Sequence, residues 1–168
     1  MRTAKAFTLV EILIVVVLLG VLAAVVIPSI ARSGSTAREG ALACDVGLLR
    51  RFILIYKSHH LEVGPGYPNG NESAQPTGDV FMEQATLSSN AFGRTAAVGT
   101  PGYPFGPYLS RLPVNPLNNL STIQMVSNDN PFPSGPDSSH GWICKPQTGE
   151  IRPDCPGEND RGIAYYDY

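Results

Sequence analysis

An acidic side chain interrupts the most apolar stretch of the chain. Residues 7–30 read FTLVEILIVVVLLGVLAAVVIPSI, and no polar side chain occurs from Ile12 to Ile27. About 20 helical residues span a bilayer core of roughly 30 Å, so this stretch is long enough to cross a membrane. Glu11 lies near its start, where a lone carboxylate in hydrocarbon costs about 2.5 kcal/mol or more. We therefore expect Glu11 to be a functional residue.

The segment in front of this stretch is short and basic, with Arg2 and Lys5. An ordinary secretory signal also starts this way, but its apolar core is about 7–15 residues long and a cleavage site follows it. Here the apolar core is longer, and the junction of interest precedes it, at Ala6-Phe7.

A basic leader, a small residue and then Phe-Thr-Leu-Val-Glu before an apolar helix resemble the class III signal of type IV pilins and pseudopilins. In that family a prepilin peptidase cuts on the cytoplasmic side, just before the Phe, and methylates the new amino terminus. The resemblance implies cleavage after Ala6 and methylation of Phe7, although the family usually has Gly at the position of Ala6. Gly20 and Pro28 fall where the family places helix-loosening residues, so we expect a kink at Pro28.

The same resemblance gives Glu11 a role in assembly. Cleavage would create a charged amino group on Phe7, and Glu11 of one subunit would pair with that group on its neighbour. Breaking a buried ion pair is costly, because each charge is then left alone in a low-dielectric environment. The pairing would recruit subunits and fix their axial register in a filament.

Helical periodicity continues beyond Pro28, from Ser29 to Leu61. Apolar or small residues recur there at intervals of three and four, which places them on one face of a helix: Ala37, Ala41, Cys44, Leu48, Phe52 and Ile55. We expect this face to pack on the rest of the protein and to bury Cys44 as a free thiol. A break near Ser33-Gly34, giving two helices, is the alternative.

The composition changes near residue 63, because residues 64–168 hold thirteen Gly and fourteen Pro. We predict a leader at 1–6, a helix at 7–62 with its membrane-spanning part at 7–30, and a small extracytoplasmic domain at 63–168. The fold class is α+β and pilin-like, with the long helix packed on a small, loop-rich antiparallel sheet.

Four segments of that domain have local structure that can be predicted. We expect a short helix within 80–90, a strand at 121–127, a hairpin over 141–152 that turns at Gly149, and a last short strand at 163–168. Residues 106–119 resemble the G-Y-L-x-x-L-P-x-D-P-W-G-N segment of the major pseudopilin of type II secretion. Asn115 stands there for the family's Asp, and Leu117-Asn118 stand for its Trp-Gly.

Cys144 and Cys155 flank the predicted hairpin. Residues beyond the membrane lie outside the cytoplasm, where disulfides persist, so we expect a Cys144–Cys155 bridge. Free thiols, or a bridge to Cys44, are the alternatives.

Calcium is a candidate cofactor, because secretion-type major pseudopilins carry a calcium site in their C-terminal loop. Six carboxylates here offer oxygen ligands of the right kind: Asp129, Asp137, Asp154, Glu158, Asp160 and Asp167. The family's Ser-Leu-Gly-Ala-Asp-Gly-like run is absent, so no ligands are assigned. His59, His60 and Glu62 lie together, but adjacent helical histidines point in different directions, so we expect no metal there.

Catalysis and nucleic-acid binding have little support. No nucleophile elbow, metal motif or phosphate loop is recognisable. Without Arg2 and Lys5, ten basic residues face fourteen acidic ones, and no basic run suits a nucleic acid. We do not expect an enzyme.

The sequence therefore predicts a structural subunit of a type II secretion pseudopilus. Its expected partners are further copies of itself, a prepilin peptidase, minor pilins and the assembly machinery of the inner membrane, which it crosses once. A type IV pilin for adhesion, motility or uptake is the near alternative. A membrane-anchored binding module that keeps its leader is the alternative of another class.

Overall fold

The computed structural model describes residues 8–168, and for residues 28–33 it describes the backbone alone. The chain forms two compact units, one ending at Arg38 and the other running from Glu39 to Tyr168. A single helix, α1 (Leu9–His59), contributes to both, which confirms one helix rather than two. The helix continues through Pro28 without a break.

Helix α1 ends earlier than predicted. Leu61 and Glu62 adopt left-handed φ angles of 57° and 65°, which end the helix after His59. Gly64 lies beyond the end of the helix, where two backbone segments approach each other. A Cβ atom at Gly64 would lie 2.2 Å from the carbonyl oxygen of Pro146, so only Gly allows this close approach of two backbones.

Within the second unit, the C-terminal part of α1 buries a different face from the predicted one. The buried side chains of this face are bulky: Leu42, Val46, Leu49, Phe52, Ile53 and Tyr56. The prediction was wrong for Ala41, Cys44, Leu48 and Ile55, which are exposed. Two apolar stripes run along this part of α1, and the bulkier one is buried because it removes more apolar area from water.

Helix α2 (Gly78–Thr86) confirms the short helix expected after residue 80, although it starts two residues earlier. The hydroxyl of its N-cap, Thr77, accepts a hydrogen bond from the Val80 N–H at 3.3 Å. Phe81 and Ala85 point into the core. Around α2 lie the 3₁₀ helix η1 (Pro68–Gly70) and a two-stranded antiparallel pair, β1 (Ser88–Ser89) and β2 (Thr95–Ala96).

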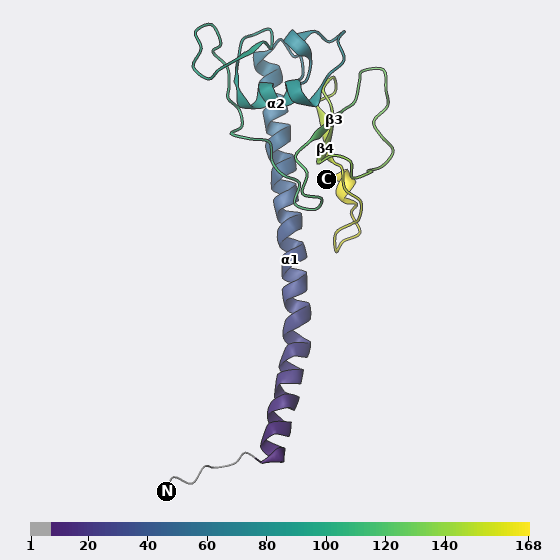
Figure 1. The fold of residues 1–168 in the computed structure, drawn as a ribbon. Helices are drawn as coiled ribbons and strands as arrows, with labels where there is room; N and C mark the ends of the chain where they lie inside the picture. The colour runs from purple at the N-terminus through teal and green to yellow at the C-terminus, as the bar shows by residue number, and fades with distance from the viewer. Residues whose placement is uncertain (1–7) are drawn as a thin grey trace. The chain divides into compact units, whose positions relative to one another are not determined.

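A three-stranded sheet completes the core, in the order β3 (Ile123–Met125), β4 (Trp142–Lys145) and β5 (Glu150–Pro153). Figure 1 shows α2, β3 and β4 beside the C-terminal half of α1. The predicted hairpin is confirmed, with Gly149 at φ 77° in its turn. The sheet is mixed rather than antiparallel, because β3 pairs parallel to β4. A parallel neighbour requires a crossover, which the polar segment 126–141 supplies.

The predicted C-terminal strand is wrong. Residues 165–167 form a 3₁₀ helix, η2 (Tyr165–Asp167), in which Tyr166 is buried. The Arg152 guanidinium holds this turn against β5: it lies 5.1 Å from the Tyr166 ring centroid and 5.0 Å from that of Phe132. The same side chain forms ion pairs with Glu150 at 2.7 Å and Asp167 at 3.4 Å.

Candidate functional site

Thr8 and Glu11 close the start of α1 with reciprocal hydrogen bonds. Glu11 Oε2 accepts from the backbone N–H and from the hydroxyl of Thr8, both at 2.9 Å. The Glu11 N–H donates to Thr8 Oγ1 at 3.3 Å. This is a capping box, which satisfies N–H groups that the first helical turn leaves without partners. The sequence carried its signature as Thr8-Leu-Val-Glu11, and reading Glu11 as a lone acid missed it.

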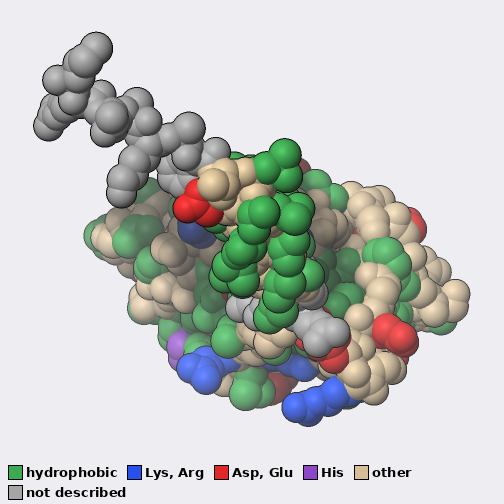
Figure 2. All heavy atoms as spheres, turned by 90° about the horizontal axis from the view of Figure 1, so that it is seen from below, with side chains coloured by type: hydrophobic (Ala, Val, Ile, Leu, Met, Phe, Trp, Pro, Cys, Tyr) green, Lys and Arg blue, Asp and Glu red, His purple; other side chains and the backbone are tan. Residues whose placement is uncertain are grey.

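The apolar part of α1 is not buried by any other segment among residues 8–168. Residues Leu9–Ile27 form 19 helical residues of mean hydropathy 3.2, and none of this segment is buried. In the end-on view of Figure 2, hydrophobic side chains cover the helix that faces the viewer. By length and composition this helix can cross a membrane. Glu11 therefore lies in the first turn of a segment that can anchor the chain.

Of the other residues of the predicted assembly site, the structure describes Gly20 in full and Pro28 by its backbone. A Cβ atom added at Gly20 would meet no atom within 4 Å, so packing within the chain does not require this glycine. Pro28 lies within α1. Ala6 and Phe7, the predicted processing junction, lie outside the described residues. The roles of these residues in processing and assembly stay predictions.

Cys144 and Cys155 do not form the expected disulfide in the structure. Both thiols are free and buried, and Cys44 is free and exposed. In the β4–β5 ladder Cys144 lies opposite Ile151, so Cys155 follows four residues later. Cys155 itself lies beyond β5, which ends at Pro153. Burial raises the pKa of both thiols, which keeps them protonated and unreactive.

The two histidines at the end of α1 serve different neighbours. His60 is buried, with Nδ1 2.7 Å from the Tyr56 carbonyl oxygen and Nε2 3.0 Å from Ser89 Oγ. Since the carbonyl can only accept, Nδ1 donates and Nε2 accepts from the hydroxyl. His59 is exposed and lies 3.0 Å from the hydroxyl of Tyr108.

The Ser89–His60 pair has the spacing of a nucleophile and its base but lacks access to a substrate. The residue Ser89 is 0 % exposed and His60 is 2 % exposed. Burial also lowers the pKa of His60. The pair therefore fixes β1 to the end of α1.

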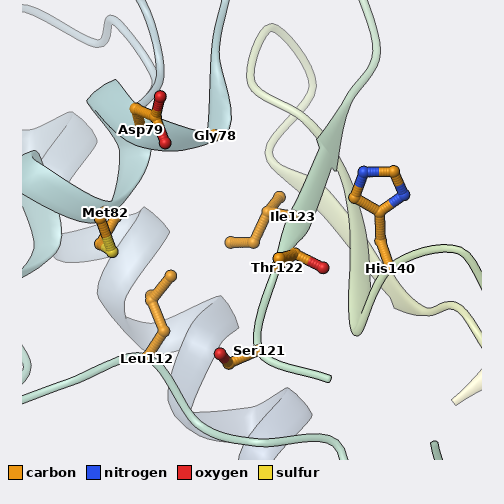
Figure 3. A pocket seen from close by; sticks show the side chains of 8 residues that line it. All are labelled: Gly78, Asp79, Met82, Leu112, Ser121, Thr122, Ile123 and His140. Carbon is orange, nitrogen blue, oxygen red and sulfur yellow. The ribbon is translucent and has the colours of Figure 1, made fainter.

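A pocket of about 380 Å³ lies between α2 and β3. Figure 3 shows Asp79 and His140 on opposite sides of it, with Ile123 between them and with Met82 and Leu112 on the side of Asp79. The two titratable groups do not face each other, so this pocket offers no acid–base pair.

Asp154, immediately after β5, organises the end of the crossover segment. Its side chain is fully buried. Oδ1 accepts the N–H groups of Asp137 and Ser138 at 2.8 and 3.0 Å, and Oδ2 accepts that of His140 at 2.9 Å. No local signal in the sequence marks Asp154 for this role, because the partners lie 14 to 17 residues away.

Two asparagine side chains complete this network. Asn115 Nδ2 donates to the Gly141 carbonyl at 2.9 Å. Asn118 Nδ2 donates to the carbonyls of His140 and Asp154 at 2.7 and 2.9 Å. Asn115, which the sequence comparison placed at the family's Asp, is itself fully buried. We call Asn115, Asn118, Asp154 and residues 137–141 the amide network.

The residues present do not fit a calcium ion. Within residues 8–168, no three His, Cys, Asp or Glu side chains come together as a metal site would require. Of the six candidate carboxylates, Asp154 is the one that is fully buried, and N–H groups occupy both of its oxygens. Calcium takes six to eight oxygen ligands, and N–H donors aimed at a carboxylate occupy the place of the cation.

Comparison with known proteins gives matches to one group. Residues 1–27 match the prokaryotic N-terminal methylation motif. Type II secretion system core protein G of Vibrio cholerae serotype O1 is 30% identical over 120 residues, which cover 71% of this chain and 69% of that protein. The protein of the same name from Klebsiella pneumoniae is 30% identical over 127 residues, or 76% of this chain and 77% of that protein.

The Escherichia coli (strain K12) protein of this name is 29% identical over 117 residues, which cover 68% of each chain. No solved structure matches. The α+β fold and the exposed apolar helix agree with the resemblance to pilins that the first residues suggested. The chain belongs to the family of type II secretion system core protein G.

Proposed function

We propose that this chain is a structural subunit of a type II secretion pseudopilus, cut after Ala6, methylated at Phe7 and polymerised through α1. The observation that carries the proposal is the start of α1. Among residues 8–168, the apolar helix there is not buried by other segments, and its one acid accepts hydrogen bonds from Thr8. Family membership and the methylation motif at residues 1–27 support it.

In the subunit before assembly, Thr8 shields the Glu11 carboxylate by donating two hydrogen bonds to it. These donors lower the cost of keeping the acid in a membrane, and they also cap the helix. In the filament, Glu11 exchanges them for the methylated amine of Phe7 on a neighbouring copy. The exchange selects one axial register, because any other register leaves both charges unpaired.

The partners follow from this route. The chain crosses the inner membrane once, with Met1 to Ala6 in the cytoplasm for the prepilin peptidase and the C-terminal domain outside it. Further copies, minor pilins and the secretion machinery contact the subunit during growth. Its role is structural rather than catalytic, in line with the burial of the Ser89–His60 pair.

Processing is tested by intact-mass and N-terminal analysis of the protein from its native membrane. We expect a chain that begins at N-methylated Phe7. A chain that begins at Met1 would instead be an uncleaved anchor, and the assembly mechanism would fail. A start beyond Pro28 would indicate an ordinary signal peptide and an exported domain.

Assembly is tested with Glu11→Gln, which removes the charge but keeps an oxygen for the hydrogen bonds from Thr8. We expect this variant to insert, to be processed and to fold, but to form no filaments. Glu62→Gln, which neutralises an exposed acid just after α1, is the matched control and should assemble normally. Electron microscopy of sheared filaments gives the readout. Wild-type assembly of Glu11→Gln would show that the ion pair is not the recruiting contact.

A further inference from the structure

The amide network contains the kinds of atoms that a bound divalent cation collects, but they already have other partners. The carbonyl oxygens of His140, Gly141 and Asp154 converge on two side chains, Asn115 and Asn118. Backbone carbonyls and carboxylates are typical calcium ligands. Here neutral amide N–H groups donate to the carbonyls.

The carboxylate of Asp154 is saturated in the same way. Three backbone N–H groups from residues 137–140 donate to it within 3.0 Å. Hydrogen bonds from backbone N–H groups satisfy a buried carboxylate in place of the water that burial removes. A cation that approached Asp154 would have to displace these donors from both of its oxygens.

The connections made by the amide network join three segments that are far apart in the chain. Asn115 and Asn118 lie before β3, residues 137–141 lie before β4, and Asp154 follows β5. Oδ1 of each asparagine also accepts a backbone N–H two residues further on, from Leu117 and Leu120 respectively. Each amide is therefore fixed in orientation, with its N–H groups directed at the carbonyls.

We propose that the amide network replaces a structural calcium ion, so that this subunit folds and keeps its C-terminal segments in place without a divalent cation. Asn115 and Asn118 supply, as neutral donors, the positive end that a cation would present to the carbonyls. Asp154 gathers the loop around a negative centre that needs no metal. The proposal does not depend on filament assembly, because it concerns contacts within one subunit.

The first test measures the Tm of the full chain in detergent micelles, with EGTA and with excess calcium chloride. We expect the two Tm values to agree within about 1 °C. A cation present at one hundred times its Kd would raise Tm by roughly 5–10 °C. A rise of that size, or saturable calcium binding by titration calorimetry, would overturn the proposal.

The second test replaces the donor directly. Asn118→Asp keeps the shape and the oxygen that accepts from Leu120, but it removes two donated hydrogen bonds and places a charge against two carbonyls. We expect Tm in EGTA to fall by roughly 5 °C or more. Asn119→Asp, at the adjacent exposed position, adds the same charge and should change Tm by about 1 °C at most.

Comparison of Asn118→Asp with Asn119→Asp can either support or overturn the proposal. A loss confined to Asn118→Asp supports the amide as the group that holds the loop. Equal Tm values in EGTA for Asn118→Asp and the wild type would show that the amide donors are dispensable, and the proposal would fail. Neither result bears on processing at Ala6-Phe7 or on filament formation, so the proposed function stands or falls separately.

Discussion

The apolar segment of α1 and the Gly- and Pro-rich part of the second unit achieve order by different means. In Leu9–Ile27 no part of the helix is buried by the other described residues, and the helix depends on its own backbone hydrogen bonds and on the Thr8 cap. In residues 64–168 the helices and strands are short, and side chain–backbone hydrogen bonds such as those of Asp154 fix the segments between them.

The difference teaches how each region tolerates change. A helix that satisfies its own backbone can exchange one apolar environment for another, such as a membrane for a bundle of helices. A loop-rich domain depends on close contacts between particular backbone segments and on particular hydrogen-bond donors. The loss or addition of a single atom therefore changes its stability more. We therefore expect substitutions in the second unit to lower the free energy of unfolding more than substitutions on the apolar helix do.

The largest effect should come from the buried face of α1. Leu49→Ala removes a side chain that is 0 % exposed and should lower the free energy of unfolding by about 2–5 kcal/mol. Leu48→Ala, at the adjacent position that is 42 % exposed, should cost less than about 1 kcal/mol. Denaturant titration of the full chain in micelles measures both. The reverse order would mean that the stripe through Ala41, Cys44 and Leu48 is the buried one.

Glycine substitutions compare the two regions directly. A Cβ atom at Gly141 would lie 2.2 Å from the Leu120 carbonyl oxygen, so Gly141→Ala must move backbone and should cost about 1–3 kcal/mol. At Gly20 a Cβ atom meets nothing within 4 Å, so Gly20→Ala should not destabilise the helix. Gly135→Ala, in an open loop, is the control within the same unit. Thermal unfolding followed by circular dichroism separates the three.

Substitution of Arg152, which joins η2 to β5, should lower the free energy of unfolding by a smaller amount. Arg152→Lys keeps the charge but loses the planar group that stacks on Phe132 and Tyr166 and pairs with Glu150 and Asp167. We expect a loss of about 1 kcal/mol, since Lys does not reproduce a stacked, forked contact. Arg161→Lys, at an exposed position, should have no measurable cost. Equal losses from both would show that the stacking does not contribute.

The smallest effect should be the pH dependence contributed by His60. Burial lowers the pKa of this imidazole below its ordinary value of about 6.5, which the unfolded chain retains. The unfolded state therefore binds a proton first as the pH falls. The contribution of His60 is fully present above about pH 6.5 and is lost as the pH falls through the folded pKa. His60→Gln should make the free energy of unfolding depend less on pH below about pH 6.5, which denaturant titration at a series of pH values measures.

The sequence by itself determined the parts that need no distant partner. A continuous apolar run fixes a helix because backbone hydrogen bonding within it is complete, and Thr8-Leu-Val-Glu11 fixes where that helix starts. The β4–β5 hairpin was also predictable, since Gly149 supplies the left-handed turn between two short apolar strands. The resemblance of the first residues to pilins was enough to indicate the family.

Tertiary structure decided the features for which the local sequence allows more than one outcome. Two stripes of α1 are apolar, and only packing against the second unit selects the bulky one and leaves Cys44 exposed. The register of β4 and β5 separates Cys144 from Cys155, although both flank the hairpin. The burial of Asp154 among N–H donors arises from segments far apart in the chain, and hydrogen bonds of that range leave no periodic trace in a sequence.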